Sequence, residues 1–254
     1  MRILTRGISS NRRNSGVPSL SSASLLLEVR NEVVDCRRCS RLVEYREEVA
    51  REKRREFLDW EYWGRPVPGF GDPNASLLIV GLAPAAHGGN RTGRVFTGDR
   101  SGDFLYKALY KVGVANQPTS RSTDDGLVLN GAYVTAAVKC APPDNKPTID
   151  ETSNCATYLA SEIDSLKDLI TILCLGQFAF KAVNRMIQNK YSLKIRSAGF
   201  SHGRVLRLGE GIPVMVCSYH PSPRNTQTGK LTEKMFLSVL RKTRAISKIA
   251  RNKP

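Results

Sequence analysis

Residues 81–99, GLAPAAHGGNRTGRVFTGD, are the stretch around which the rest of this 254-residue chain can be interpreted. They follow an apolar run, SLLIV at 76–80, whose length and β-branched content are typical of a buried strand. Glycine and proline predict a loop here, yet the loop carries several functional side chains close together, namely His87, Arg91, Arg94 and Asp99. Residues 103–112 then have the apolar periodicity of a helix. A long loop between a strand and a helix amino end is typical of a binding site.

Two other interpretations of this loop are open. It could be an ordinary connection that is glycine-rich because nothing constrains it, although connections of this length are uncommon in compact domains. It could also bind a nucleotide phosphate, but the chain contains neither GxGxxG nor GxxxxGK[ST]. A site for another kind of ligand is therefore the favoured interpretation.

The remainder of the chain alternates between predicted strands and helices. Strands are predicted at 132–138, 169–175, 204–208 and 212–218, and helices at 24–34, 41–57, from 148, at 177–187 and at 232–251. This alternation predicts an α/β fold with a mostly parallel sheet covered on both faces. Ligands gather at the carboxyl ends of such strands. The loop after Gly81, the turn at Lys139 and Cys140, Gly176 and His220 should therefore meet at one edge.

Composition indicates one domain and a polyanionic partner. Residues 1–23 are predicted to be a flexible basic leader and residues 24–254 a single domain. Lys and Arg exceed Asp and Glu by 39 to 23, a net charge of +16, which is typical of nucleic-acid binding, although a basic surface without one partner is the alternative. No apolar run is long enough to span a bilayer and no signal-peptide core is present, so we expect an intracellular protein.

Four of the six cysteines are candidate metal ligands. Cys174 and Cys217 lie within apolar strands and are predicted to be buried hydrophobic residues. The others are a CxxC pair, Cys36 and Cys39, and two single residues, Cys140 and Cys155. Disulfides are rare inside cells, so these thiols indicate a metal centre, with zinc and an iron–sulfur cluster both open from the residues alone.

Taken together, these motifs resemble the family 5 (type B) uracil-DNA glycosylases. The resemblance is carried by residues 81–99, by VKCAPPDNKPT at 138–148, by HPSPRNTQTG at 220–229 and by the four cysteines, and it extends from about Cys36 to the last helix. It implies a three-layer αβα sandwich and a [4Fe-4S] cluster on the four cysteines. It also implies that a uracil flipped out of DNA is released by hydrolysis of its N-glycosidic bond, which leaves an abasic site.

The resemblance assigns roles within that site. Leu82, Ala83 and Pro84 would line the base pocket with backbone groups, and Phe96 would stack on the base. His220 would donate a hydrogen bond to the negative charge that develops on the departing base. The alternative for His220 is a strand-end histidine satisfied by neighbouring carbonyl groups.

The first motif departs from many relatives outside this group, which place a polar or acidic residue there to activate water. Here it contains Leu82, Ala83 and Ala85. Asp99 is the nearest acid in the loop, and we expect it either to orient water and stabilise the sugar cation or to cap the following helix. With few polar groups to discriminate between bases, the site is expected to act more weakly on other deaminated or modified bases such as hypoxanthine.

The expected partner is DNA, either double-stranded or, as an open alternative, single-stranded. The protein is expected to be a monomer. A sliding clamp or another repair partner is not assigned. Phosphate contacts are predicted for basic loop residues, with residues 223–228 near the minor groove, while solvated loop cations are the alternative. The predicted DNA-contacting residues are Arg91, Arg94, Lys146, Arg224 and Asn225. Two rival functions are a non-catalytic nucleic-acid-binding protein with a structural or redox-sensing cluster and, less favoured, a nucleotide-binding enzyme.

Overall fold

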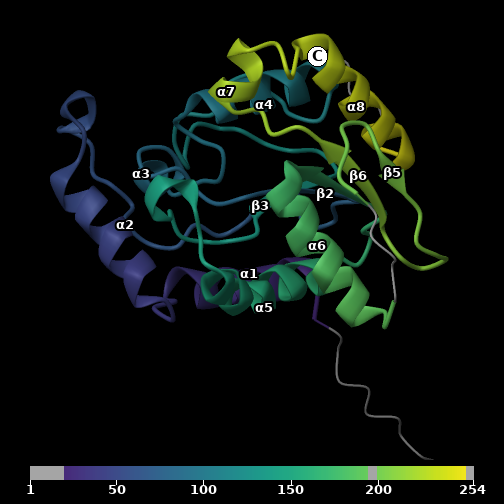
Figure 1. Ribbon diagram of the computed structural model, residues 1–254, viewed down its shortest axis with the longest axis horizontal. Helices are drawn as coiled ribbons and strands as arrows, with labels where there is room; N and C mark the ends of the chain where they lie inside the picture. Colours follow the sequence, from purple (N-terminus) through teal and green to yellow (C-terminus); the bar gives the residue numbers. More distant parts are fainter. Residues whose placement is uncertain (1–19, 194–198, 250–254) are drawn as a thin grey trace, which may run out of the picture.

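The computed structural model describes residues 20–193 and 199–249 and has a six-stranded sheet at its centre (Figure 1). The strand order is β1-β3-β2-β4-β6-β5. The four inner strands are parallel, namely β3 (Ala132–Ala136), β2 (Leu77–Gly81), β4 (Thr171–Leu175) and β6 (Val214–Ser218). Both edge strands, β1 (Phe70–Gly71) and β5 (Val205–Leu206), are short and antiparallel. The mostly parallel sheet is as predicted.

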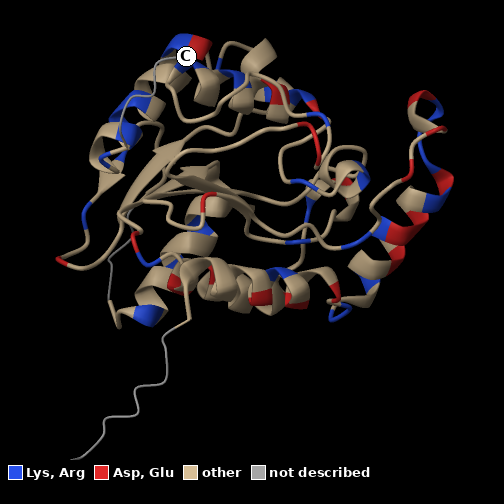
Figure 2. Cartoon of the chain, turned by 180° about the vertical axis from the view of Figure 1, so that it is seen from behind, with Lys and Arg blue, Asp and Glu red and all other residues tan. Residues whose placement is uncertain are grey.

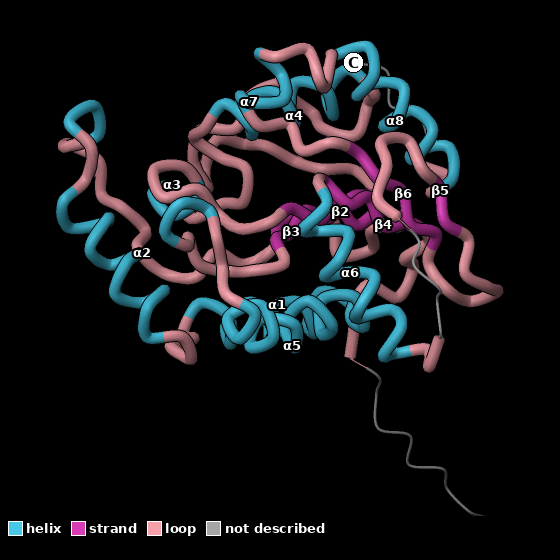
Figure 3. The backbone as a smooth tube through the Cα atoms, viewed as in Figure 1, coloured by secondary structure: helices cyan, strands magenta, loops and turns pink. Residues whose placement is uncertain are grey.

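Helices cover both faces of the sheet, which makes the fold a three-layer α/β sandwich (Figure 3). One layer contains α1 (Ser22–Val34), α5 (Ile149–Ser165) and α6 (Gln177–Lys190), and the other contains α4 (Arg100–Lys111), α7 (Pro223–Gln227) and α8 (Glu233–Ile246). Beyond one end of the sheet lie α2 (Ser40–Glu52) and α3 (Gly89–Thr92). Short 3-10 turns occur at η1 (Arg55–Phe57) and η2 (Pro143–Asn145). The predicted fold class is confirmed.

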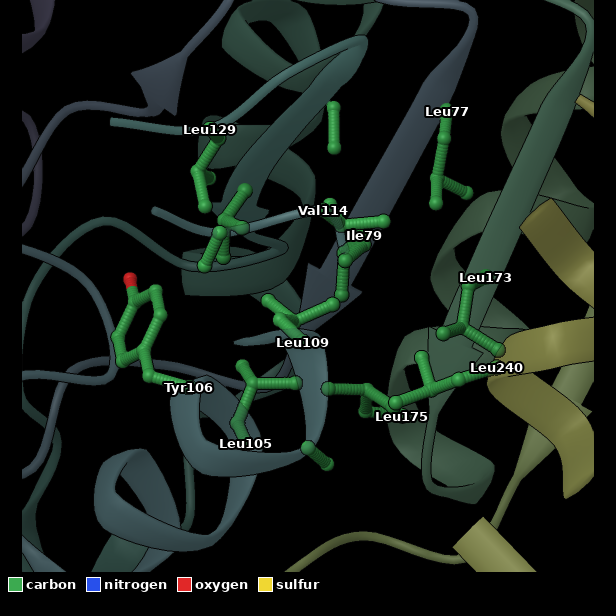
Figure 4. Packing of buried hydrophobic residues seen from close by; sticks show 14 of the residues in the cluster. Leu77, Ile79, Leu105, Tyr106, Leu109, Val114, Leu129, Leu173, Leu175 and Leu240 are labelled. Carbon is green, nitrogen blue, oxygen red and sulfur yellow. The ribbon is translucent and has the colours of Figure 1, made fainter. Parts of the chain in front are cut away.

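Each face of the sheet has its own apolar cluster because the inner strands are buried on both sides. On the α4 and α8 side, Ile79 and Leu173 of the sheet pack with Leu109 of α4 and Leu240 of α8 (Figure 4). Burying one such leucine side chain stabilises the fold by roughly 1.5–3 kcal/mol. The sheet is therefore a rigid support for the loops at its carboxyl edge.

Most predicted elements agree with the structure to within a few residues. The helix expected from residue 148 has the predicted capping box, in which Thr148 Oγ1 accepts from Glu151 N and the Glu151 carboxylate accepts from Thr148 N. The last helix ends at Ile246 rather than 251, a position that lies outside the described residues.

Three local expectations are corrected. The segment 81–99 is not entirely loop, since it contains α3. The charged helix predicted to reach residue 57 stops at Glu52, because Lys53 adopts a positive φ of 54°. Helix α1 begins at Ser22, inside the predicted leader, because Ser21 Oγ accepts a hydrogen bond from Ser24 N at 3.1 Å. Residues 1–19 of that leader lie outside the described residues.

Among the described helices, none combines the length and the apolar character that crossing a bilayer requires.

Candidate active site

Segments that follow different parallel strands meet at one edge of the sheet. Beyond β2, the carbonyl oxygens of Gly81 and Leu82 accept hydrogen bonds from Ala137 N and Val138 N, both at 3.0 Å. Beyond β4, Gly176 N donates to Ser218 O of β6 at 2.8 Å. The convergence expected from the strand order is therefore present.

At this edge the side chains of Phe96 and His220 lie against each other. Their rings are stacked, with centroids 5.7 Å apart and planes inclined by 30°. Gly81 makes room for Phe96, since a Cβ at that position would be 2.5 Å from Phe96 Cζ. Gly176 lies close to His220, since a Cβ there would be 3.2 Å from the histidine Cβ. Two glycines at strand ends thus allow two rings from distant segments to meet.

His220 is held in its neutral form. Burial lowers the pKa of its imidazole to about 4, and no neighbouring charge or hydrogen bond within the described residues contributes to that shift. A neutral imidazole keeps one N–H donor at pH 7. The segment is fixed by Asn225 Nδ2, which donates to His220 O at 2.8 Å. The backbone of His220 is therefore anchored, and its ring is neutral at pH 7.

Asp99 caps helix α4. Its Oδ1 accepts a hydrogen bond from Gly102 N at 2.9 Å, and its Oδ2 faces the central loop, where a Cβ on Gly88 would be 2.6 Å away. Burial raises the pKa of this carboxyl group, and hydrogen bonds from the backbone of Gly102 and Ser101 oppose that rise. The capping role is thus realised, and one oxygen is left on the side of the central loop.

Leu82, Ala83 and Pro84 form the first turn after β2. Leu82 and Ala83 are partly buried and Pro84 is buried against Gly89. The next turn is closed by Ala85, whose carbonyl oxygen accepts from the backbone N–H groups of Gly88 and Asn90, both at 3.1 Å. These residues therefore border the same edge as Phe96 and His220.

Arg94 does not point toward solvent, which corrects the expectation that it contacts phosphate. Its side chain is 3% exposed and donates to Asp125 Oδ1 at 2.7 Å, Ser120 Oγ at 3.1 Å and Thr123 O at 2.8 Å. Its guanidinium also lies 4.5 Å from the ring centroid of Phe70. A phosphate contact would require breaking all of these interactions, so Arg94 has a structural role.

Arg91 is likewise buried, and the same expectation is corrected for it. Its guanidinium lies 3.8 Å from the ring centroid of Phe57 and 4.2 Å from that of Trp60. Its Nε and Nη2 donate to the carbonyl oxygens of His87 and Gly98 at 2.8 and 3.1 Å. Arg91 therefore joins the central loop to the segment after α2.

Lys146 and Arg224 are exposed, so the structure leaves their side chains accessible. Lys146 follows η2, and Arg224 lies on α7 just after His220. Asn225 is partly buried, and its side chain donates the hydrogen bond to the backbone oxygen of His220 described above.

The four candidate metal ligands line one pocket. Cys36 and Cys39 lie between α1 and α2, Cys140 follows β3, and Cys155 lies on α5. The cavity between them is small, about 10 Å³, and apolar groups such as Leu42 also line it. All six cysteines are free thiols, and Cys174 and Cys217 are buried in the sheet as predicted.

Cations and amides surround these sulfurs. Arg46 Nη1 donates to Cys140 Sγ at 3.0 Å, and Asn154 Nδ2 lies 3.4 Å from Cys39 Sγ. Lys139 is buried beside them and pairs with Glu162 at 2.7 Å. Burial raises the pKa values of Cys140 and Cys155 to about 12 and about 11, while Arg46 opposes the rise at the first and Lys139 at the second. Buried positive charge beside these thiols favours their deprotonated form. The pocket therefore suits a metal group that several cysteine thiolates bind.

The sequence-based predictions assigned no role to Arg46. It is one of many charged residues on α2, yet its side chain is only 2% exposed because it turns toward Cys36 O and Cys140. Its position a few residues after a CxxC pair is the one signal that could have identified it.

Comparisons with known proteins give a consistent result. The model of the family described as "Uracil DNA glycosylase superfamily" matches residues 68–244. The chain is 47% identical over 215 residues to the type-5 uracil-DNA glycosylase of Pyrobaculum aerophilum, which covers 85% of this chain and 90% of that protein. The type-5 enzyme of Mycobacterium leprae is also 47% identical over 228 residues, 89% of this chain and 98% of the relative. The type-5 enzyme of Thermus thermophilus is 47% identical over 212 residues, 84% and 94% of the two chains.

Proposed function

This chain belongs to the uracil DNA glycosylase superfamily, and on that premise we propose how its residues recognise and release a base. It is a uracil-DNA glycosylase that acts in DNA repair. It is 47% identical to three type-5 uracil-DNA glycosylases over most of their length. Because a base inside a duplex is inaccessible, the nucleotide is flipped into a pocket before its N-glycosidic bond is hydrolysed. Water supplies the hydroxyl group that remains on the sugar, and the base leaves with a proton.

The stacked pair of Phe96 and His220 carries this proposal. The flipped base stacks on Phe96 and is bordered by the backbone of Leu82, Ala83 and Pro84. The N–H group of His220 donates to a base oxygen on which negative charge develops as the bond breaks. A fixed donor of this kind contributes roughly 3–4 kcal/mol to transition-state stabilisation. Burial lowers the pKa of this imidazole to about 4, so at pH 7 the ring is neutral and has one N–H donor.

Asp99 acts on the sugar side in this proposal. Its Oδ1 is used to cap α4, and its Oδ2 orients the attacking water or stabilises the cationic sugar. The apolar side chains of Leu82, Ala83 and Ala85 favour a tolerant pocket. Weaker removal of other deaminated bases, such as hypoxanthine, is therefore part of the proposal.

A [4Fe-4S] cluster held by Cys36, Cys39, Cys140 and Cys155 is proposed as the cofactor. The fit rests on four thiols around one pocket and on the donors from Arg46 and Asn154. Within the described residues no three His, Cys, Asp or Glu side chains are grouped closely enough to hold a single metal ion. We choose a cluster over zinc because four thiolates that ligate several irons can come from distant parts of the chain, as these do. Such a cluster would cross-link α1, α2, α5 and the segment after β3.

DNA is the substrate, and we propose phosphate contacts from the exposed Lys146 and Arg224. We further propose that the protein acts inside the cell as a monomer, since a single chain brings Phe96 and His220 together. An activity measurement tests this function against a non-catalytic DNA-binding role.

A single-turnover assay with a uracil-containing duplex, followed by alkali to cleave abasic sites, tests the proposal. His220→Ala should lower the rate about 100- to 1,000-fold, as loss of a preorganised donor does. Cys174→Ala, a substitution at a buried residue of β4, controls for general disturbance and should leave the rate within a few-fold. No strand cleavage by the unmodified protein, or equal rates for His220→Ala and wild type, would refute the proposed role.

A further inference from the structure

The outer surface of α8 is basic along its whole length. Six residues of α8 and the turn after it are exposed, four of them are cations and none is acidic; they are Lys234, Ser238, Arg241, Lys242, Ala245 and Lys248. Among the described residues, none of these four cations forms a salt bridge. The same layer also exposes Arg100 and Lys107 of α4, Arg224 of α7 and Lys230.

The one acid on α8 is paired with a cation, and Asp103 of α4 is the other exposed acid of this layer. Glu233, the sole acid on α8, pairs with Lys111 of α4, and the charge of Lys107 also lowers the pKa of its carboxyl group. The opposite helix layer differs, since α1, α5 and α6 together carry six acidic and four basic residues, and α5 has four of those acids and no base. Figure 2 shows the resulting contrast, with blue segments along α8 and red segments prominent on the opposite layer. The surplus of positive charge is therefore concentrated on one side of the molecule.

This surface is continuous with the candidate active site. Helix α4 begins directly after Asp99, and α7 with Arg224 leads into α8. Between them, Lys230 Nζ lies 5.1 Å from the ring centroid of Tyr219, the residue that precedes His220. A polyanion engaged at the site can thus extend along α7, which carries no acid, and over α8, whose one acid is paired with Lys111.

We propose that the outer face of α8, with Lys107 of α4, binds the phosphate backbone of duplex DNA that flanks the flipped base. The proposal rests on the proposed function and adds a second contact surface to it. The fourteen residues of α8 extend over about 21 Å. That length matches roughly six base pairs of duplex at about 3.4 Å per pair. The proposed contacts are to phosphates, which carry no sequence information, so the face binds without base specificity.

The test compares two triple variants that each remove three positive charges. The first carries Lys234→Gln, Arg241→Gln and Lys242→Gln on α8. The control carries Arg30→Gln, Lys181→Gln and Arg185→Gln, all exposed residues of the opposite layer. Affinity for an undamaged 30-base-pair duplex is measured as a function of salt concentration. Each lost phosphate contact should reduce the slope of log K against log salt by about 0.9, so the α8 variant should lose about 2 to 3 and the control almost none.

A second measurement separates this inference from the proposed function. Uracil release from a short single-stranded oligonucleotide depends on the active site and not on α8, so both variants should keep the wild-type rate within about twofold. Equal changes in slope for the two variants, no change for either, or tighter binding to anionic vesicles than to duplex DNA would overturn the α8 surface. Failure of the wild type to release uracil would instead overturn the proposed function, and the salt slopes would still decide whether α8 binds DNA.

Discussion

The Cβ position of Gly81 and the ring of Phe96 compete for the same space, since a methyl group on Gly81 would lie 2.5 Å from Phe96 Cζ. This packing holds Phe96 against His220 at a centroid distance of 5.7 Å. The residue that ends β2 thereby sets the position of an aromatic ring fifteen residues further along the chain.

Gly81→Ala should therefore displace Phe96 and lower the rate of uracil release about 100-fold, as a displacement of about 1 Å in a reacting site does. The cause can be isolated with Phe96→Leu, which removes the colliding ring atoms. In that background Gly81→Ala should cost much less, and the non-additivity measures the contact. Additive effects of the two substitutions would show that Gly81 acts elsewhere.

Asp99 has two functions that substitution can separate. Asparagine caps a helix about as well as aspartate, so Asp99→Asn should keep the thermal stability while it lowers the rate about 100-fold or more if the carboxylate acts on water or the sugar. Asp99→Ala should additionally lose about 1 kcal/mol of the free energy of unfolding. Full activity of Asp99→Asn would leave helix capping as its sole role.

The neutral state of His220 predicts a pH dependence of stability. Its pKa is about 4 in the folded protein and 6.5 in the unfolded chain, so the unfolded state binds more protons between these values. The free energy of unfolding therefore rises with pH across this window. The stability that the neutral ring allows is fully present above pH 6.5 and is lost as the pH falls from about 6.5 to about 4. His220→Gln should flatten the melting temperature across this window relative to wild type. His87 and His202, whose pKa values are also lowered, remain in both proteins and cancel in the comparison.

The cysteine pocket predicts iron and sulfide in the purified protein. Cys140→Ser should lose most of the iron and the visible absorbance and lower the melting temperature, because the pocket joins segments from four parts of the chain. Cys174→Ala, which lies in the sheet, should retain both. Arg46→Gln removes a buried donor to Cys140 and should make the bound group easier to remove with chelator. Stoichiometric zinc without iron would contradict the assignment.

Arg94 and Arg224 should behave oppositely. Arg94→Met leaves the Asp125 carboxylate without its partner and should lower the free energy of unfolding by about 3 kcal/mol, with no change in the salt dependence of DNA binding. Arg224→Gln should leave stability unchanged and reduce the salt slope by about 0.9. Equilibrium unfolding and binding titrations on the same preparations test both statements, and a normal salt slope for Arg224→Gln would remove it from the DNA contacts.

The local pattern of the chain was sufficient for the order of strands and helices and for the edge at which the site lies. Apolar runs such as 76–80 and 169–175 specify buried parallel strands, and parallel strands place the loops after Gly81, Ala136 and Ser218 at one edge. The spacing of Thr148 and Glu151 similarly specified the start of α5, because a capping box depends on four consecutive residues. The short elements β1 and α3 were missed because a few residues carry no periodicity.

By itself, then, the sequence determined the fold class, the candidate residues at the strand ends and the set of cysteines, because these depend on local periodicity and on motifs. The tertiary structure decided which of those residues meet. It brought Phe96 to His220 and Arg46 to Cys140, and it buried Arg91 and Arg94 against partners remote in sequence. The physical reason is that a charged residue in a loop has the same local signature whether it faces water or a buried carboxylate. Its surroundings are fixed only when distant segments pack.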